Sequence, residues 1–410
     1  MKKANQMLQA ADREEGVSQT VIALGFVSLF MDMCSEMVYT QVPIFLKVVL
    51  GVPASVIGLI EGIAESSASL MRLISGHLSD ISGRRKPFAL LGYSMGALTK
   101  PLMALVTLWP FVLALRLIDR LGKGIRSAPR DALITETTPI AIRGKAFGMH
   151  RAMDTAGAVL GPLLGFFFLI HLRASLSRQL RLLFLVAGIP GILAVLILCL
   201  FVKEPIIQGS KRAADRKVRP PLPHWRDLDP LYRKYLLVVA LFNLGNFSDA
   251  FMVLRAHSLN FTSWQILLLY SAFNLVEMLL SYKTGRLSDR VGRQPLITAG
   301  YLVFAIVCLG MALSESKVEL IAFFLLYGLY YTLTQGVQRA LAADFADPNR
   351  RAAQIGVYHA VIGIALLPAS LIAGLLYDIR PSFPFFLGAS IALISAMLMS
   401  RLPRPAQPLP

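Results

Sequence analysis

Hydrophobic residues recur along this chain in long runs, which are separated by short polar stretches. Twelve runs are long enough to cross the roughly 30 Å of a bilayer's hydrocarbon core as helices. None shows the strict apolar–polar alternation of a membrane β-strand. The predicted spans cover residues 18–48, 53–77, 87–108, 110–135, 145–170, 181–202, 234–258, 263–283, 294–313, 318–343, 353–377 and 383–401. We therefore predict an all-α membrane protein with twelve transmembrane helices.

The composition favours the same class. Of the 410 residues, 55% are hydrophobic and 16% are charged, whereas soluble domains carry about 25% charged residues. The polar N-terminus lacks a signal peptide's apolar core, so we expect the first span to be retained. The three cysteines lie singly, which predicts neither disulfides nor a metal site. A phosphate-binding loop, a catalytic triad and zinc-ligand spacing are all missing, so we predict no enzyme, no cofactor and no ATP-driven pump.

The Lys and Arg residues that give the net charge of +17 are concentrated on one side of the predicted spans. Clusters of Lys and Arg follow the even-numbered spans, as at residues 84–86, 283–293 and 401–404, and they crowd the segment between spans six and seven. Under the positive-inside rule both termini lie in the cytoplasm. We therefore expect a multi-pass protein of a bacterial inner membrane, with the lipid bilayer and not nucleic acid as its partner. Three arginines in residues 171–181 break the pattern.

The chain divides into two related halves. GHLSDISGRRKP at 76–87 matches GRLSDRVGRQP at 285–295, an offset of 209 residues, and both follow the second span of their half. Such an offset indicates an internal duplication. We predict an N-terminal six-helix bundle at 1–202, a proline-rich charged linker at 203–232 and a C-terminal six-helix bundle at 233–410. Two pseudo-symmetric bundles with a site between them are a known transporter plan.

Span four carries an unusual stripe of charge. At about 100° per residue, its charged side chains fall within an arc of roughly 140° on one helix face. An ionisable group inside a bilayer costs about 2.5–3.5 kcal/mol on insertion scales, so it normally faces protein or a water-filled cavity. The stripe therefore predicts a central cavity. Its members are Arg116, Asp119, Arg120, Lys123, Arg126, Arg130 and Asp131.

Two motifs resemble the major facilitator superfamily. The run Gly76-x-Leu78-Ser79-Asp80-x-x-Gly83-Arg84-Arg85 resembles that family's loop signature between spans two and three, and Arg116 stands where the family has a span-four arginine. The run Gly157-x-x-x-Gly161-Pro162-x-x-Gly165 is similar to the span-five motif of its proton-coupled antiporters. The resemblance covers the whole chain. The added charge at Asp119-Arg120-x-Gly122-Lys123-Gly124 departs from the usual pattern and indicates a distinct branch.

This resemblance implies a monomeric secondary transporter that works by alternating access. It also implies that Asp80 caps a neighbouring helix and pairs with cytoplasmic arginines when the transporter faces outward. At Asp289, in the less complete copy, a plain loop-capping role is an equal alternative. The residues expected to control conformational switching are Gly76, Asp80, Gly83, Arg84, Asp289, Gly157, Gly161 and Pro162.

Intramembrane carboxylates are the candidates for proton coupling. Carboxyl groups that lie close together in a low dielectric can exchange a proton in the physiological range. A fixed scaffold of salt bridges with the span-four arginines is the alternative role for each of them. The candidates are Asp32, Glu36, Glu61, Glu65 and Asp154, with Arg116 adjusting their protonation.

Polar and aromatic residues of both halves are predicted to line the substrate cavity. The set is Arg116, Arg120, Lys123, Asn246, Asp249, Asn274, Glu277, Tyr331, Gln335 and Arg339. Arginine binds carboxylates and phosphates with two parallel hydrogen bonds. Because the carboxylates near Arg116 and Arg120 are expected to be shared, these arginines favour an anionic ligand.

The leading functional prediction is proton-coupled export of a small organic solute, anionic or zwitterionic, such as a siderophore-like metabolite or a drug. Uptake of an organic anion or siderophore by symport is the alternative. The Met- and Cys-containing run MDMCSEM at 31–37 leaves metal-ion transport as a minor third reading. A non-transporting receptor is a further one.

Overall fold

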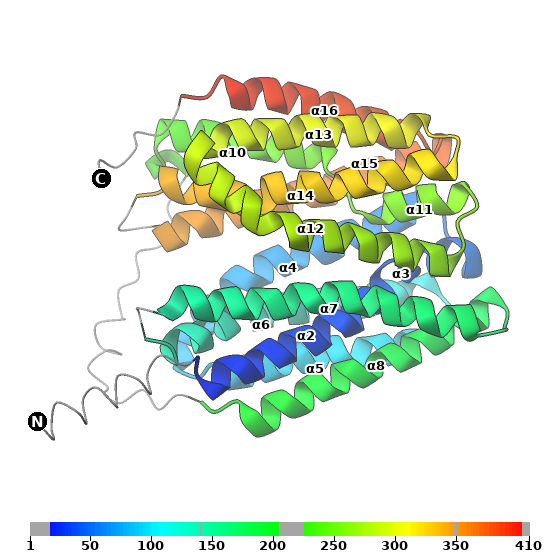
Figure 1. Cartoon of the computed structure of the whole chain (residues 1–410), viewed down its shortest axis with the longest axis horizontal. Helices are drawn as coiled ribbons and strands as arrows, with labels where there is room; N and C mark the ends of the chain where they lie inside the picture. The colour runs from blue at the N-terminus through cyan, green and yellow to red at the C-terminus, as the bar shows by residue number, and fades with distance from the viewer. Residues whose placement is uncertain (1–16, 140–141, 205–224, 348–350, 404–410) are drawn as a thin grey trace, which may run out of the picture.

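The computed structural model describes residues 17–139, 142–204, 225–347 and 351–403, and this part of the chain is helical throughout apart from short connections (Figure 1). The N-terminal half contains α2 (Gln19–Tyr39), α3 (Gln41–Ile44), the π-helix η1 (Phe45–Val49), α4 (Ala54–Ser82), α5 (Lys86–Met103), α6 (Trp109–Glu136), α7 (Arg143–His171) and α8 (Leu176–Phe201).

The C-terminal half begins, within the described residues, with a short 3₁₀ turn and continues through long helices. It contains η3 (Trp225–Asp227), α10 (Pro230–Gly245), α11 (Ala250–Ser258), α12 (Ser263–Val291), α13 (Arg293–Leu313), α14 (Lys317–Phe345), α15 (Arg351–Ile379) and α16 (Phe383–Ser400). When α2, α3 and η1 count as one span and α10 and α11 as another, the described helices occupy twelve span positions. The all-α prediction is confirmed. Most of the predicted linker, 205–224, lies outside the described residues.

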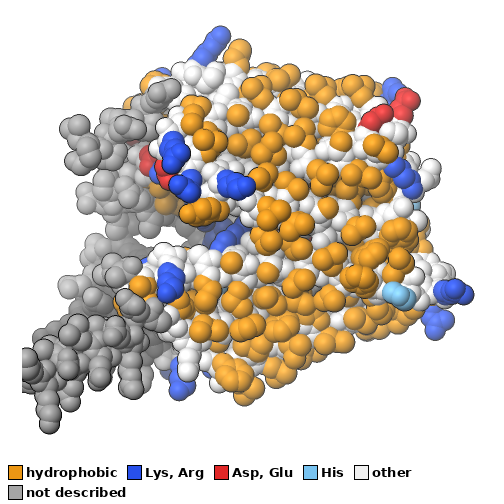
Figure 2. Space-filling model, viewed as in Figure 1, with side chains coloured by type: hydrophobic (Ala, Val, Ile, Leu, Met, Phe, Trp, Pro, Cys, Tyr) orange, Lys and Arg blue, Asp and Glu red, His pale blue; other side chains and the backbone are white. Residues whose placement is uncertain are grey.

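Ten of these spans are long and apolar enough to cross a membrane by composition alone. The other two are α5, which carries Lys100 in its interior, and α6, which carries the charged stripe. Both are accommodated because their charged faces turn inward: Lys100, Arg116, Asp119, Arg120 and Arg126 are all buried. On the face shown in Figure 2, hydrophobic side chains cover most of the surface between the two charged ends of the molecule.

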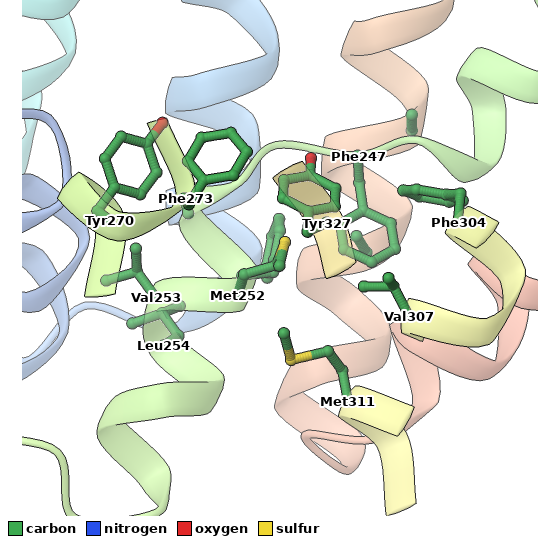
Figure 3. Packing of buried hydrophobic residues seen from close by; sticks show 14 of the residues in the cluster. Phe247, Met252, Val253, Leu254, Tyr270, Phe273, Phe304, Val307, Met311 and Tyr327 are labelled. Atoms are coloured by element: carbon green, nitrogen blue, oxygen red, sulfur yellow. The ribbon is translucent and has the colours of Figure 1, made fainter. Parts of the chain in front are cut away.

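The two halves have different interiors. The larger apolar core contains most of the buried aromatic and sulfur-containing side chains of the C-terminal half, among them Met252, Phe304 and Met311 (Figure 3), and it continues into the N-terminal half at residues such as Phe45 and Phe184. The rings of Phe242 and Tyr301 stack there with their centroids 3.8 Å apart. The N-terminal half has a second, smaller apolar cluster and buries many more charged groups. Apolar packing therefore stabilises the C-terminal half more directly.

The segment expected to form a loop after span two is helical. Helix α4 continues to Ser82, so Gly76 and Asp80 lie on its last two turns. The helix ends at Gly83, which adopts a left-handed conformation with a φ of 66° that only glycine takes without strain. In the second copy α12 likewise runs on to Val291, which places Asp289 on a helix. The loop prediction was wrong because nothing before Gly83 disfavours a helix.

The halves meet along two pairs of helices, α4 with α15 and α7 with α12. Backbones approach closely at glycines: a Cβ on Gly58 would lie 2.1 Å from the Ser370 carbonyl oxygen, and one on Gly374 would lie 2.5 Å from that of Ala54. We call the side where the described chain ends lie the termini side, and the opposite side the far side. These contacts lie toward the far side, whereas the surface is hollowed between the halves toward the termini side (Figure 2).

A polar contact closes the far side. The carboxylate of Asp378, at the end of α15, accepts hydrogen bonds from the backbone N–H groups of Ala54 (2.7 Å) and Ser55 (2.8 Å). These are the first residues of α4, whose N-cap position holds Pro53 and supplies no side-chain cap. A carboxylate at a helix N-terminus satisfies free N–H groups and the helix dipole. Asp378 therefore links the two halves on the far side.

Replacing Asp378 with alanine should open the far side. Hydrogen bonds to a charged group contribute about 1.5–3 kcal/mol each, so losing two should shift the ratio of far-side-open to far-side-closed molecules at least about tenfold. The distance between spin labels at Val48 and Arg380 measures this shift. Lys47→Ala is the control, because the Lys47–Asp378 ion pair is long (3.8 Å) and partly exposed, and should change little. An unchanged distance distribution in Asp378→Ala would contradict this role.

Candidate transport site

The candidate site lies where the halves separate toward the termini side. Helices α2, α4, α6 and α7 face it from one half, and α12, α14 and α15 face it from the other. Lys123, Gln335 and Arg339 lie well inside long membrane helices and are nevertheless exposed. Polar side chains exposed at such positions indicate that water reaches this space, in keeping with the hollow between the halves in Figure 2.

The deepest ion pair joins α4 to α6. The Arg116 guanidinium donates to Glu61 through Nε (3.0 Å to Oε1) and through one terminal nitrogen (2.7 Å to Oε1 and 2.5 Å to Oε2). Both side chains are buried, with 4% and 1% of their surfaces exposed. Ser248 of the other half lies 3.5 Å from the same carboxylate. This geometry neutralises both charges.

Two more pairs extend this network. Arg120 Nε lies 3.1 Å from a Glu65 oxygen, in an ion pair without good hydrogen-bond alignment. Asp119 binds the ammonium group of Lys100 on α5 and lies 3.9 Å from Arg116. The Tyr39 ring lies 5.5 Å from the guanidinium carbons of both arginines. The expectation that Arg116 and Arg120 share too few carboxylates was wrong, because each has a carboxylate of its own within ion-pair distance.

A second acidic group lies between α2 and α7. Asp154 accepts a hydrogen bond from Ser28 Oγ (2.8 Å) and pairs with Arg151 (3.0 Å). Arg151 also lies 3.4 Å from Glu277 on α12, so it bridges the two halves. Asp32, one turn from Ser28 on α2, lies at the same contact, because a Cβ on Gly157, three residues after Asp154, would lie 3.0 Å from the Asp32 Cβ. Two carboxyl groups are therefore neighbours here.

Several charged groups at the cavity have no partner among the described side chains. Glu36 and Lys123 make neither hydrogen bonds nor ion pairs there, and both have surface in contact with the cavity. Arg72 on α4 has a buried Nε without a hydrogen bond; Arg130 and Arg339 of the other half repel it, while Asp131 and Glu65 attract it. Arg72 and Lys123 therefore lie near carboxylates without forming an ion pair with any described side chain.

The C-terminal half contributes tyrosines around one carboxylate. Asp249 follows the break between α10 and α11 and accepts hydrogen bonds from Tyr327 (2.6 Å), Tyr331 (3.2 Å) and Tyr270 (3.4 Å). Asn246 caps the end of α10 at the same break. Asp249 and Tyr331 therefore lie together, as two members of the predicted set.

Asn274 was predicted to line the cavity, but it lies at a contact between the two halves. Its amide is buried and donates to the Ala158 carbonyl oxygen of α7 at 2.9 Å. It thus joins the halves at their contact. Gln335 and Arg339, one turn apart, face open space instead.

The residues of the predicted switch motifs lie in two places. Asp80 pairs with Arg85 at 2.6 Å, and Arg85 also contacts Glu136 at 3.2 Å, both within the N-terminal half. Arg84 is exposed beside them. On α7, Gly161 and Pro162 are buried against α2, and a Cβ on Gly161 would lie 2.6 Å from the Met33 carbonyl oxygen. The glycines of the span-five motif therefore form a ridge on α7 that packs against span one.

Sequence reasoning missed some members of the site. Lys100 could have been found as the lone charge within span three. Ser28, Tyr39 and Tyr270 carried no signal, because serine and tyrosine are ordinary in membrane helices. Within the described residues, no three His, Cys, Asp or Glu side chains gather as a metal site would require.

Comparison with known proteins identifies the family. The model of the Major Facilitator Superfamily matches residues 24–314 and 236–410. An uncharacterized MFS-type transporter of Methanocaldococcus jannaschii is 36% identical over 405 residues, covering 97% of this chain and 98% of the relative. The chain belongs to the major facilitator superfamily.

Other relatives of this MFS transporter are more distant. The multidrug resistance protein MdtH of Proteus mirabilis is 25% identical over 373 residues and 86% of both chains. The crystal structure of the human organic anion transporter MFSD10 has a TM-score of 0.66 at 18% identity, covering 93% of this chain and 99% of that one. The latter likeness confirms the MFS fold.

The Glu61–Arg116 pair of this MFS transporter should be needed for stability as a pair. Glu61→Leu or Arg116→Met alone leaves one buried charge without its partner, which typically costs about 3–5 kcal/mol. The double variant removes both charges and should recover most of the loss. Thermal unfolding in detergent measures all three variants. Single variants as stable as the unmodified protein, or a double variant no better than either, would contradict the pairing.

Proposed function

We propose that this MFS transporter exports a small organic anion or zwitterion from the cytoplasm in exchange for protons. The termini side carries the clusters of Lys and Arg that follow the even-numbered spans, so the positive-inside rule assigns it to the cytoplasm. The hollow of Figure 2 then faces the cytoplasm. A cavity open on that side is the state in which an exporter loads its solute.

The solute's charge is inferred from the uncompensated cations. Arg72 and Arg339 belong to opposite halves and repel each other, and His359 on α15 lies within electrostatic range of both. Lys123 adds a further free charge on α6. Neighbouring guanidinium groups that have no ion-pair partner are costly in a low dielectric, and an anion would relieve that cost. This cluster is the observation that carries the proposal.

The position of the cluster also suits alternating access. Because Arg72 lies on α4 and Arg339 on α14, one bound anion could contact both halves. Its charge would screen their repulsion and favour closure of the cytoplasmic side. The partly exposed carboxylates Asp32 and Glu36 lie deeper along α2 and could bind the amino group of a zwitterion or a proton.

Export by antiport rests on two further observations. The span-five motif, which resembles that of proton-coupled antiporters, forms a packed ridge against α2 at Gly157 and Gly161. The relative MdtH is named a multidrug resistance protein, which fits an outward direction. The proton gradient is the energy source in this proposal, with no further cofactor.

Flux in proteoliposomes tests the proposal. Untargeted metabolite profiling of a strain that lacks the transporter, compared with its parent, supplies the candidate solutes. An imposed pH gradient should drive these solutes against the direction of proton flow. Movement with the protons would assign symport and overturn export by exchange. Transport that ignores the gradient would overturn proton coupling.

The cation cluster should determine affinity for the anion. Arg72→Gln or Arg339→Gln removes a charge-assisted hydrogen bond of about 1.5–3 kcal/mol, so binding of the transported solute should weaken roughly 10- to 100-fold. The loss should shrink at high salt, because the site is open to water. Arg290→Gln is the matched control, since Arg290 is an exposed arginine at the same end of the molecule. Unchanged or tighter binding in both cluster variants would rule out the anion.

A further inference from the structure

We infer that Asp32 and Asp154 form a carboxyl pair that holds one proton between α2 and α7, and that this pair is the proton-coupling site. The inference rests on the proposed proton exchange and specifies which groups carry it out. It also assigns Arg151 as the residue that transmits the pair's charge to the other half.

The geometry places both carboxyl groups at one contact between α2 and α7. Ser28 and Asp32 lie one turn apart on α2, and Ser28 Oγ donates to Asp154 Oδ1 at 2.8 Å. A Cβ on Gly157, three residues after Asp154 on α7, would lie 3.0 Å from the Asp32 Cβ, so Asp32 lies at the same contact. Neighbouring carboxylates in a low dielectric repel each other, which favours a pair that holds one proton and can bind a second from water.

Gly157 makes this contact possible. It lies on α7, three residues after Asp154, and faces α2. A Cβ on Gly157 would lie 2.3 Å from the Leu29 carbonyl oxygen and 3.0 Å from the Asp32 Cβ. Any side chain there would push α2 away and separate the two carboxyl groups. The glycine ridge of span five thus has a specific task at this position.

The other acidic candidates are less suited to exchanging protons. Glu61 and Glu65 are already engaged in ion pairs with Arg116 and Arg120. Glu36 is free but stands alone, without a second carboxyl group in contact.

The charged groups around the pair come from every neighbouring helix. Lys123 and Arg126 on α6 and Glu36 on α2 act on Asp32. Arg130 on α6, with His150 and Arg151 on α7, acts on Asp154. The net positive surroundings keep one of the two carboxyl groups ionised while the other retains its proton.

Arg151 connects the pair to the opposite half. Its guanidinium lies 3.0 Å from Asp154 and 3.4 Å from Glu277 on α12. When the pair takes up its second proton, Asp154 loses its charge and its attraction for Arg151. Arg151 then interacts with Glu277 alone, which changes a contact between the halves. Release of that proton to the cytoplasmic cavity restores the bridge.

Infrared difference spectroscopy and transport of the same reconstituted protein test the pair. The unmodified protein should show the band of a hydrogen-bonded protonated carboxyl group, and Asp32→Asn and Asp154→Asn should each abolish it. Both variants should keep solute exchange but lose at least tenfold of the accumulation driven by a pH gradient. Glu319→Gln, an exposed carboxylate near the far side, is the control and should retain the band and the accumulation.

The infrared band and the gradient-driven accumulation together distinguish a failure of the proposed function from a failure of the carboxyl pair. If the unmodified protein does not respond to a pH gradient, the proposed function fails, whatever the infrared band shows. If it responds and both asparagine variants still accumulate solute, or if it lacks the band, the pair is not the coupling site and the proposed function stands. Exchange retained by the variants confirms that they are folded; a variant without exchange is replaced by the glutamate substitution, which lengthens the side chain and should displace the band.

Gly157→Ala gives an independent prediction, because both aspartates remain. The added methyl group should separate α2 from α7, weaken the shared-proton band and reduce gradient-driven accumulation at least about threefold. Gly148→Ala on the same helix is the matched control, since nothing lies within 4 Å of a Cβ there. A normal band and normal accumulation in Gly157→Ala would contradict the role of this glycine.

Discussion

A charged side chain inside a membrane protein must be compensated, and this constraint organises the N-terminal half. Glu61 with Arg116 and Asp119 with Lys100 neutralise each other across α4, α5 and α6. Breaking such a pair leaves a buried charge that typically costs several kcal/mol. These ion pairs fix how α4, α5 and α6 are rotated about their own axes relative to one another. The charges left outside these pairs are the ones available to a solute or a proton.

The two halves contribute differently to a transport cycle. The C-terminal half is stabilised by aromatic packing around Phe242 and Tyr301, and its carboxylate Asp249 is held by tyrosines. The seam between α4 and α15 brings glycines close to backbone atoms, whereas the seam between α7 and α12 also carries side-chain contacts such as Arg151–Glu277. Close backbone packing of this kind lets the α4–α15 seam open at one end while it closes at the other. Asp378 adds a polar contact that is specific to the far-side-closed arrangement.

Much of this architecture could be predicted from local sequence. The spans follow from runs of apolar residues, and the stripe on α6 follows from helical periodicity. Spacing of four residues also places Glu61 and Glu65 on one face of α4. The partner of each carboxylate could not be predicted, because it depends on how α2, α4 and α6 are rotated against one another. For the same reason Asn274 was assigned to the cavity although it faces Ala158.

The central claim is that the transporter does not hold the solute and the exchanged proton at the same time, so that binding of one displaces the other. The most direct measurement is the pH change when the transported solute is added to the purified protein in weakly buffered detergent solution. Competition predicts that solute binding releases protons. The release should disappear at a pH where the Asp32–Asp154 pair has already given up its second, exchangeable proton. Proton uptake on binding, or no change at any pH between 5 and 9 (about two units to either side of neutral), would contradict the account.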